Sequence, residues 1–289
     1  MGGISQNPDP SMEFLTRSAS VRDRIRIWRT AGTRVALVPT KGTLHKGHMS
    51  LVAEAQERAD HVIVSIFADP REREAPTLEA DRELLQKMGA SIVFAPPLQE
   101  IYPIGRELAV TVNVPALADT LEGAQRPGYF SDVATVLAKL FNLIRPDVAL
   151  FGERNFQQLV IVQRLVDDLF LSIEVVGCAT WRDGDGLAAA TANRHLTADE
   201  RALAPRLYAI LREFSAKIDV GARDYEALQR QGMEALAAAG FVPEYFVIRQ
   251  AADLATVRNG ARDLVILAAA RLNAHRLTDN LRVRVIDRF

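Results

Sequence analysis

The sequence predicts an α/β protein in which a doubly wound parallel sheet is followed by a smaller C-terminal α+β domain. Two observations support this class. Short apolar runs alternate with helix-like patterns along the N-terminal part of the chain, and this alternation ends near residue 182. A strand that is apolar throughout is typical of a parallel sheet covered by helices on both faces. We therefore expect two domains, at residues 1–182 and 183–289.

In the first domain, strands and helices are expected to alternate along the chain. Strand-like runs are apolar throughout, whereas helix-like segments carry apolar residues at a spacing of about 3.6. Strands are expected at 34–39, 61–67, 91–95, 147–151 and 173–178, and helices at 48–59, 78–88, 131–144 and 156–169. Ser131 is the expected N-cap of the third of these helices, and Gly89 is expected to end the second.

The second domain is expected to begin at the polar turn Asp183-Gly184-Asp185-Gly186. Its helices are predicted near 198–218 and 225–239, and its two or three strands within 244–249, 264–270 and 281–286. Helices followed by a run of strands are typical of an α+β module with a core of its own.

Composition excludes several classes of protein. Lys and Arg number 35 against 36 Asp and Glu, which gives a formal net charge of −1 over 289 residues. A near-neutral chain argues against binding to nucleic acid or to a membrane surface. Uncharged apolar stretches such as 109–116 fall far short of the ~18–20 residues that span a bilayer. We therefore expect no nucleic-acid partner and no membrane partner.

The single cysteine, Cys178, bears on the location of the protein. One cysteine cannot form an internal disulfide, which fits a reducing compartment, so a cytoplasmic protein is expected. Cys178 ends a run expected to be a buried strand, and we expect it to be a structural thiol rather than a nucleophile. The N-terminus lacks the apolar core of a signal peptide, and its first dozen residues are expected to form a flexible leader.

The chemistry is expected where the first strand passes into a helix. Residues 39–48 read Pro-Thr-Lys-Gly-Thr-Leu-His-Lys-Gly-His. The unpaired N–H groups and the dipole at a helix N-terminus form an anion site, and Gly47 allows the backbone to approach a phosphate closely. His45 and His48 can then donate hydrogen bonds to a phosphate whose charge grows during displacement. The alternative is that both are surface histidines at the start of a helix.

The segment His45-Lys46-Gly47-His48 resembles the His-x-Gly-His signature of a nucleotidylyltransferase superfamily with a Rossmann-like fold. The longer stretch 37–52 resembles the pantothenate synthetase (pantoate–β-alanine ligase) family. Further blocks resemble this family, in the family's order, at 122–128, 133–136, 139–142, 146–149, 151–153, 156–159 and 185–188. The resemblance therefore covers nearly the whole chain.

The resemblance implies an ATP-dependent ligase with a two-step reaction. A carboxylate attacks the α-phosphorus of Mg–ATP and displaces pyrophosphate, and an amine then converts the acyl-adenylate into an amide. The implied partners are a small carboxylic acid and an amine, and the implied cofactors are ATP and Mg²⁺. The implied assembly is a homodimer through the first domain. Which residues would bind the metal is left unknown.

The resemblance also implies roles for individual residues. The expected catalytic residues are His45, His48 and Arg154. The residues expected to bind ATP are Thr40, Lys41, Gly42, Gly47, Gly152, Thr191 and Arg194. The residues expected to bind the acid or the amine are Asp69, Glu72, Arg126, Tyr129 and Gln158.

On the acid side, several positions depart from the family pattern. Asp69 and Glu72 stand where the family has Asn and Gln, which places carboxylates beside a substrate that is itself a carboxylate. This indicates a different acid, an unused acid site, or side chains turned to solvent. Tyr129 replaces a histidine. The loop through 73–76 is shorter than in the family, which weakens the expectation of a flap that excludes water.

On the nucleotide side, the departures move charge rather than remove it. Arg154 and Asn155 replace a Lys-Asp pair, and Ala190-Thr191-Ala192-Asn193 replaces Ser-Ser-Arg-Asn. Lys41 replaces a methionine within the phosphate loop. Lys41 and Arg194 are therefore the candidates for replacement cations.

Three functions stay open at the level of the sequence. The first is an ATP-dependent ligase for pantoate and β-alanine, or for an altered acid and amine. It is favoured by the cation kept at Arg154 and by the retained residues His45, His48, Arg126 and Gln158. The second is a catalytically impaired paralogue that binds a nucleotide or a partner, favoured by Ala190 and Ala192 and by the shorter loop. The third transfers a nucleotidyl group to a phosphate acceptor, which the similarity to the ligase along the whole chain makes the weakest.

Overall fold

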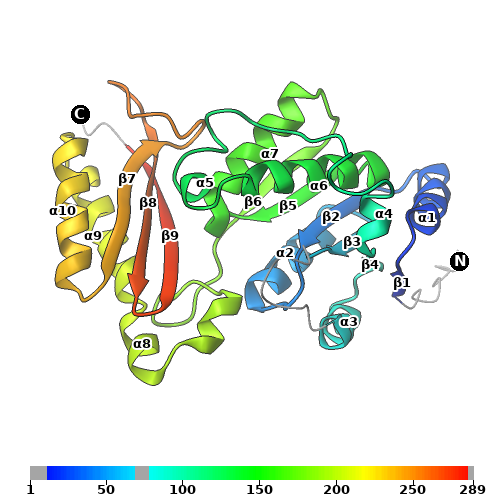
Figure 1. Ribbon diagram of the computed structural model, residues 1–289, viewed down its shortest axis with the longest axis horizontal. Coiled ribbons are helices and arrows are strands. Elements are labelled where there is room, and N and C mark those ends of the chain that lie inside the picture. Colours follow the sequence, from blue (N-terminus) through cyan, green and yellow to red (C-terminus); the bar gives the residue numbers. More distant parts are fainter. Residues whose placement is uncertain (1–11, 69–77, 286–289) are drawn as a thin grey trace, which may run out of the picture.

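The protein is described here by a computed structural model that covers residues 12–68 and 78–285. Three expectations lie outside the described residues: the leader apart from Met12, the substrate-binding roles of Asp69 and Glu72, and the shorter loop after them. The described part of the chain contains two sheets, one parallel and one antiparallel, with helices packed against them (Figure 1).

The first sheet has six parallel strands in the order β1-β4-β3-β2-β5-β6. The strands are β1 Glu13–Leu15, β2 Val35–Thr40, β3 His61–Ile66, β4 Ile92–Phe94, β5 Val148–Gly152 and β6 Glu174–Cys178. The chain runs outward from β2 to β4 and then returns to the other side of β2 through β5 and β6. The order therefore reverses between β2 and β5, which is where doubly wound sheets bind their ligands.

Helices cover both faces of this sheet. They are α1 Ser18–Thr30, α2 Lys46–Gln56, α3 Leu78–Lys87, α4 Leu98–Ile101, α5 Glu122–Gln125, α6 Tyr129–Ile144 and α7 Phe156–Asp168. Side chains along β2 alternate between the two faces, as the pleat of a strand requires. Val35 and Leu37 pack in a cluster with α1, α6 and α7, whereas Ala36 and Val38 pack with α2 and α3. The expected doubly wound architecture is confirmed.

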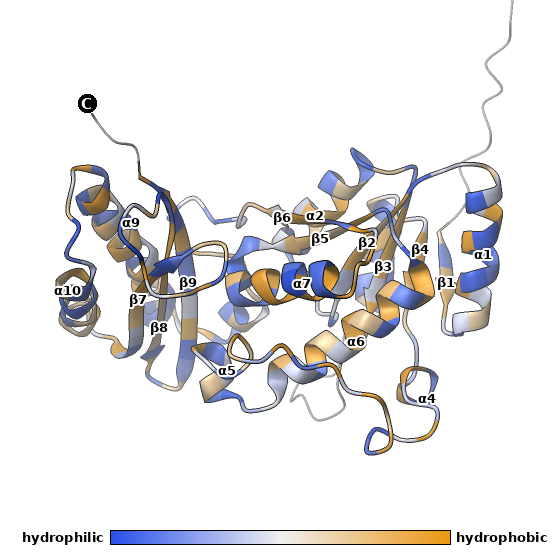
Figure 2. Ribbon diagram, turned by 90° about the horizontal axis from the view of Figure 1, so that it is seen from above, coloured by the Kyte–Doolittle hydropathy of each residue, from blue (hydrophilic) through white to orange (hydrophobic). Residues whose placement is uncertain are grey.

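The second sheet is antiparallel, in the order β7-β8-β9. Its elements are α8 Ala198–Leu203, α9 Arg206–Asp219, α10 Tyr225–Ala238, β7 Val242–Gln250, β8 Asp263–Leu272 and β9 His275–Arg284. Figures 1 and 2 place α9 and α10 on the side of this sheet that faces away from the parallel sheet. On its other face, Val265 and Leu267 of β8 pack against Phe156 and Val160 of α7. The two parts of the chain thus share apolar contacts at the start of α7.

Three expectations about these elements are wrong in detail. The helix expected at 131–144 begins at Tyr129, and Ser131 donates to Asn113 Oδ1 at 2.7 Å instead of capping it. The single helix expected near 198–218 is two helices, α8 and α9, with Pro205 as the N-cap of the second. The strand that ends at Cys178 lies at an edge of the sheet and is only half-buried, because β5 is its one neighbour.

The Cys178 thiol is nevertheless a poor nucleophile. Burial raises its pKa to about 11, so the thiolate is scarce at neutral pH. This agrees with the structural role expected for it.

Six elements of the described chain have no counterpart in the expectations: β1, α1, α4, α5 and the short helical turns η1 (Glu153–Asn155) and η2 (Thr191–His195). Strand β1 pairs in parallel with β4 at the far edge of the sheet, and α1 packs Val21 and Ile25 onto the sheet face shared with α6.

Among the described residues, no helix is long and apolar enough to cross a membrane. The domain boundary expected near residue 182 stays a prediction.

Candidate active site

A cavity of about 740 Å³ lies at the point where the strand order reverses. Residues at the ends of β2 and β3 line it, together with residues of α6, the turn after β5 and the segment 190–192. Ten of the residues expected at the site line this cavity: Thr40, Lys41, Gly42, His45, His48, Arg126, Tyr129, Arg154, Gln158 and Thr191. The fold therefore brings together residues that lie up to 151 positions apart in the chain, from Thr40 to Thr191.

The paired histidines are held by the start of α2. His45 is the N-cap of this helix, and its Nδ1 accepts a hydrogen bond from the Gly47 N–H at 3.1 Å. The N–H of His45 donates in turn to Nδ1 of His48 at 3.3 Å. Because both Nδ1 atoms accept hydrogen bonds, the proton of each neutral ring is on Nε2. Each ring therefore keeps one N–H group that can donate to a ligand in the cavity.

Burial keeps both imidazoles neutral. Burial, followed by the positive charge of Arg154, lowers the pKa of His45 to about 4. Burial also lowers the pKa of His48 to about 3, with further contributions from His45 and then Arg154. The ring centroids are 4.1 Å apart, so a second proton would be opposed by the first. At neutral pH the pair is a set of neutral hydrogen-bond donors.

Gly47 is required for this arrangement. A Cβ atom at this position would lie 2.9 Å from Cε1 of His45 and 3.1 Å from its Nδ1. The ring would have to move away from the Gly47 N–H group that orients it. The glycine expected to admit a phosphate thus also fixes the position of a histidine.

A buried carboxylate from α3 fixes the loop that leads to the histidines. Asp81 is 3% exposed, and its two oxygens accept from the N–H groups of Thr43 at 2.7 Å and Leu44 at 2.8 Å. The Thr191 hydroxyl donates to the carbonyl of Thr43 at 3.2 Å. Sequence reasoning missed Asp81, because an acidic residue in an amphipathic helix looks like part of its solvated face.

Two residues that line the cavity each have a buried polar atom with no hydrogen-bond partner in the described part of the chain. Arg154, on the short helical turn η1 (Glu153–Asn155), is half-buried, but its Nε atom is buried and has no hydrogen-bond partner among the described residues. The Ser65 hydroxyl, near the end of β3, is also buried and also has no hydrogen-bond partner among the described residues. Both residues line the cavity. Buried polar groups in native proteins are almost always hydrogen-bonded, so these two atoms are exceptions at the wall of the cavity.

Two cations lie against one aromatic ring on the α6 side of the cavity. The guanidinium carbon of Arg126 is 3.7 Å from the centroid of the Tyr129 ring. The ammonium of Lys41 is 4.6 Å from the same centroid and donates to the Tyr129 hydroxyl at 3.4 Å. Arg106 also lines this side and forms an ion pair with Asp132 at 2.6 Å. Sequence reasoning missed Arg106, which follows α4 in irregular chain and carries no motif.

The other expected residues are placed as follows. Gly47 and Gly152 line a smaller adjoining cavity of about 120 Å³, which also borders both histidines and Arg154. Arg194 is exposed, lines neither cavity, and donates from Nε to Nε2 of His195 at 3.1 Å. The roles assigned to all of these residues stay predictions.

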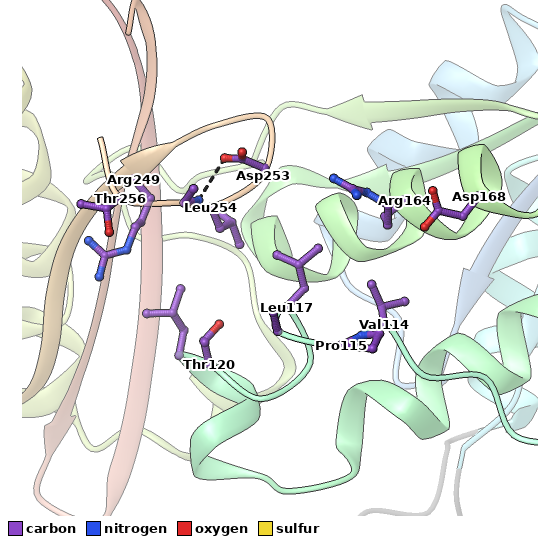
Figure 3. A pocket seen from close by; sticks show the side chains of 13 residues that line it. Val114, Pro115, Leu117, Thr120, Arg164, Asp168, Arg249, Asp253, Leu254 and Thr256 are labelled. Carbon is purple, nitrogen blue, oxygen red and sulfur yellow. Dashed lines mark hydrogen bonds between the residues drawn. The ribbon is translucent and has the colours of Figure 1, made fainter. Parts of the chain in front are cut away.

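A third cavity, of about 560 Å³, lies away from the histidines between the two parts of the chain. Figure 3 shows Arg164 and Asp168 of α7 on one side of it and Arg249 and Thr256 on the other. No residue expected at the site lines it among those that the structure describes.

The described residues offer no metal centre. No cluster of three or more His, Cys, Asp or Glu side chains occurs in residues 12–68 and 78–285. Asp132 is the one carboxylate among the described lining residues of the large cavity, and Arg106 already pairs with it. A divalent cation at this site would therefore depend on ligand oxygens.

A parallel sheet whose strand order reverses beside a His-x-Gly-His turn and a polar cavity defines a nucleotidylyltransferase-like α/β protein. Within this class, residues 13–282 match the model of the family described as Pantoate-beta-alanine ligase. The chain belongs to this family.

Relatives of known name agree with this assignment. The pantothenate synthetase of Nitrosococcus oceani is 46% identical over 282 residues, which cover 95% of this chain and 99% of the relative. The pantothenate synthetase of Thioalkalivibrio sulfidiphilus is 45% identical over 280 residues, covering 94% and 98% of the two chains.

Solved structures agree as well. The crystal structure of pantothenate synthetase from Thermus thermophilus matches with a TM-score of 0.83 and 37% identity, covering 93% of this chain and 99% of that one. Pantoate-beta-alanine ligase from Francisella tularensis, complexed with beta-gamma ATP and beta-alanine, matches with a TM-score of 0.76 and 27% identity, covering 93% and 97%.

The neutral state of the histidines predicts a specific dependence of stability on pH. In the unfolded chain each ring takes up a proton near pH 6.5, but in the folded protein only near pH 4 for His45 and pH 3 for His48. The stability that the neutral rings contribute is therefore complete above about pH 6.5 and is lost as the pH falls toward the folded values. Between pH 7 and pH 5 we expect a loss on the order of 1–2 kcal/mol for each ring, with the smaller value for His45, which solvent screens more.

Two measurements check this expectation. Ring titration by NMR should give midpoints near 4 and 3 for His45 and His48. Urea unfolding of a His48→Gln variant at pH 7 and pH 5 should show a smaller loss of stability than the wild type. Midpoints near 6.5 would contradict the neutral pair.

Proposed function

We propose that the protein is an ATP-dependent ligase that joins pantoate to β-alanine through an acyl-adenylate. The observation that carries this proposal is the cavity at the reversal of strand order, which two neutral imidazoles and the half-buried guanidinium of Arg154 line together. Membership of the pantoate-beta-alanine ligase family supports the choice of acid and amine. The complex of the Francisella tularensis relative with beta-gamma ATP and beta-alanine supports ATP and the amine.

In the first step, a carboxylate oxygen of pantoate attacks the α-phosphorus of ATP and pyrophosphate leaves. The Nε2–H groups of His45 and His48 donate to phosphate oxygens, whose negative charge increases as the bond to the attacking oxygen forms. Arg154 supplies a positive charge and an Nε–H group for the same oxygens. Neutral donors suit this role because they need not release a proton during the step.

In the second step, the amine nitrogen of β-alanine attacks the acyl carbon and AMP leaves, with loss of a proton from the amine. The residues of the cavity have the task of holding the acyl-adenylate until the amine arrives and of keeping water away from it. Gln158, Arg126 and Tyr129, which line the same cavity, are the groups proposed to bind the acid and the amine.

Mg²⁺ is proposed to enter with ATP as part of the substrate. Magnesium usually keeps several waters and binds substrate phosphates together with one or two carboxylates. The described residues provide one lining carboxylate, Asp132, and it is paired with Arg106. The ATP phosphates would therefore supply most of the non-water ligands.

The activity is tested with purified protein, Mg–ATP, pantoate and β-alanine. We expect AMP, pyrophosphate and pantothenate in equal amounts, and only when both the acid and the amine are present. His48→Ala should lower kcat/KM by at least about 100-fold, since it removes a donor to the charge that develops on phosphorus. His61→Ala is the matched control, because His61 stacks on Trp28 at the opposite end of β3 and should leave activity unchanged.

Other products would contradict the proposal. Pyrophosphate release with the nucleotide retained on a phosphate acceptor would indicate nucleotidyl transfer. Nucleotide binding without turnover, for pantoate and for a panel of other acids and amines, would indicate a catalytically impaired paralogue. Full activity of His48→Ala would contradict the assigned phosphate site.

We further propose that the protein is a homodimer through its first domain. Three large apolar side chains lie exposed in the irregular segment between α4 and α5: Ile104, Leu108 and Val110, at 65%, 73% and 80% exposure. Exposed apolar residues that gather on one segment are typical of an interaction surface.

Sedimentation velocity tests the proposed dimer. We expect the wild type to sediment at about twice the chain mass of 31.9 kDa and Val110→Asp to sediment as a monomer. Phe170→Asp is the matched control, because Phe170 is 93% exposed after the end of α7 and lies outside this segment. A monomeric wild type would contradict the proposal.

A further inference from the structure

A single asparagine of the C-terminal sheet reaches the turn that carries Arg154. Asn280 lies on β9 and is only 6% exposed. Its Nδ2 donates two hydrogen bonds, to the carbonyl oxygens of Glu153 and Arg154, both at 2.9 Å. These residues are 127 and 126 positions away in the sequence, so the contact depends entirely on how the two sheets are packed.

Asn280 is itself held in place through its neighbour Asp279. Its own N–H donates to Oδ1 of Asp279 at 2.8 Å. Asp279 is bound by both terminal nitrogens of Arg182, at 2.6 and 2.8 Å, and the guanidinium of Arg182 stacks on Tyr208 at 3.5 Å. A bidentate pair of this kind fixes orientation as well as position. Asn280 is therefore a rigid donor and not a mobile surface amide.

The turn that it contacts has little support of its own. The η1 turn is three residues long and lies between β5 and α7. Short turns of this kind have poor internal hydrogen-bond geometry. Yet Arg154 at its centre lines the cavity beside the histidines, and its buried Nε has no hydrogen-bond partner among the residues that the structure describes.

We infer that Asn280 is a positioning residue, which holds the η1 turn so that the Arg154 guanidinium stays directed into the nucleotide cavity. This inference rests on the proposed function, because it takes Arg154 to be a phosphate contact. It goes further in making the C-terminal domain part of the nucleotide site, through two hydrogen bonds to the backbone rather than through a group that touches the ligand.

The geometry also gives Arg154 a distant counter-charge. The carboxylate of Asp279, next to Asn280 on β9, favours the protonated form of Arg154 and so opposes the lowering of the Arg154 pKa by burial. Arg182, which is paired with Asp279, acts in the opposite direction and lowers the Arg154 pKa, so the contribution of this strand to the site is chiefly positional.

A double-mutant cycle on ATP affinity tests the inference. Asn280→Leu keeps the size and branching of the side chain but removes both donors and adds no charge. Calorimetry with Mg–ATP should show binding weakened about 10- to 100-fold, which is the cost expected when a contact is misplaced by about 1 Å. In an Arg154→Ala background the same Asn280→Leu change should weaken binding less than about twofold, because the residue through which it acts is gone.

A control variant separates positioning from general destabilisation. Asn273→Leu removes a single asparagine Nδ2 hydrogen bond, to Glu200 Oε1 at 2.9 Å, from an exposed residue of the turn that precedes β9. It should lower thermal stability and leave ATP affinity unchanged. Equal losses from Asn280→Leu with and without Arg154 would overturn the inference, as would no loss in either background.

Failure of the proposed function would look different. A wild type that binds ATP but makes no pantothenate would leave the positioning role intact. If the wild type bound no ATP, crystal structures of the wild type and of Asn280→Leu would be compared directly. A displaced η1 turn in the variant would support the inference, and an unmoved turn would overturn it.

Discussion

The site depends on one constraint: the backbone at the start of α2 holds two imidazoles in their neutral form with the proton on Nε2. Both Nδ1 atoms accept N–H groups, one from Gly47 and one from His45. Burial then removes the option of a second proton. A helix N-terminus would in any case attract an anion, but only this arrangement adds two fixed donors beside it.

Other elements serve this constraint from a distance. Asp81 of α3 binds two N–H groups of the loop before the helix, and Thr191 binds a carbonyl of the same loop. Asn280 binds the turn that carries Arg154. The histidines follow a strand of the parallel sheet. Side chains from α3, from the segment around Thr191 and from β9 hold the two loops beside the cavity, the one before α2 and the one that carries Arg154.

The sequence alone could predict those features that leave a local signal. Apolar runs predict the strands β2, β3 and β5, and the His-x-Gly-His motif predicts the start of α2, because these patterns follow from local geometry. The three-residue strand β1 was too short to show a period. Asp81 and Asn280 could not be found either, since their roles arise from contacts 37 and 126 positions away. Arg194 is exposed and lines neither cavity beside the histidines, and its expected role in binding the nucleotide stays a prediction.

The most direct test is a crystal structure of the wild type with Mg–ATP, because it locates the nucleotide relative to the imidazoles. We expect phosphate oxygens within about 2.7–3.2 Å of Nε2 of both His45 and His48. A nucleotide bound elsewhere, for example in the cavity beside Arg164 and Arg249, with the histidines free of phosphate, would contradict the account.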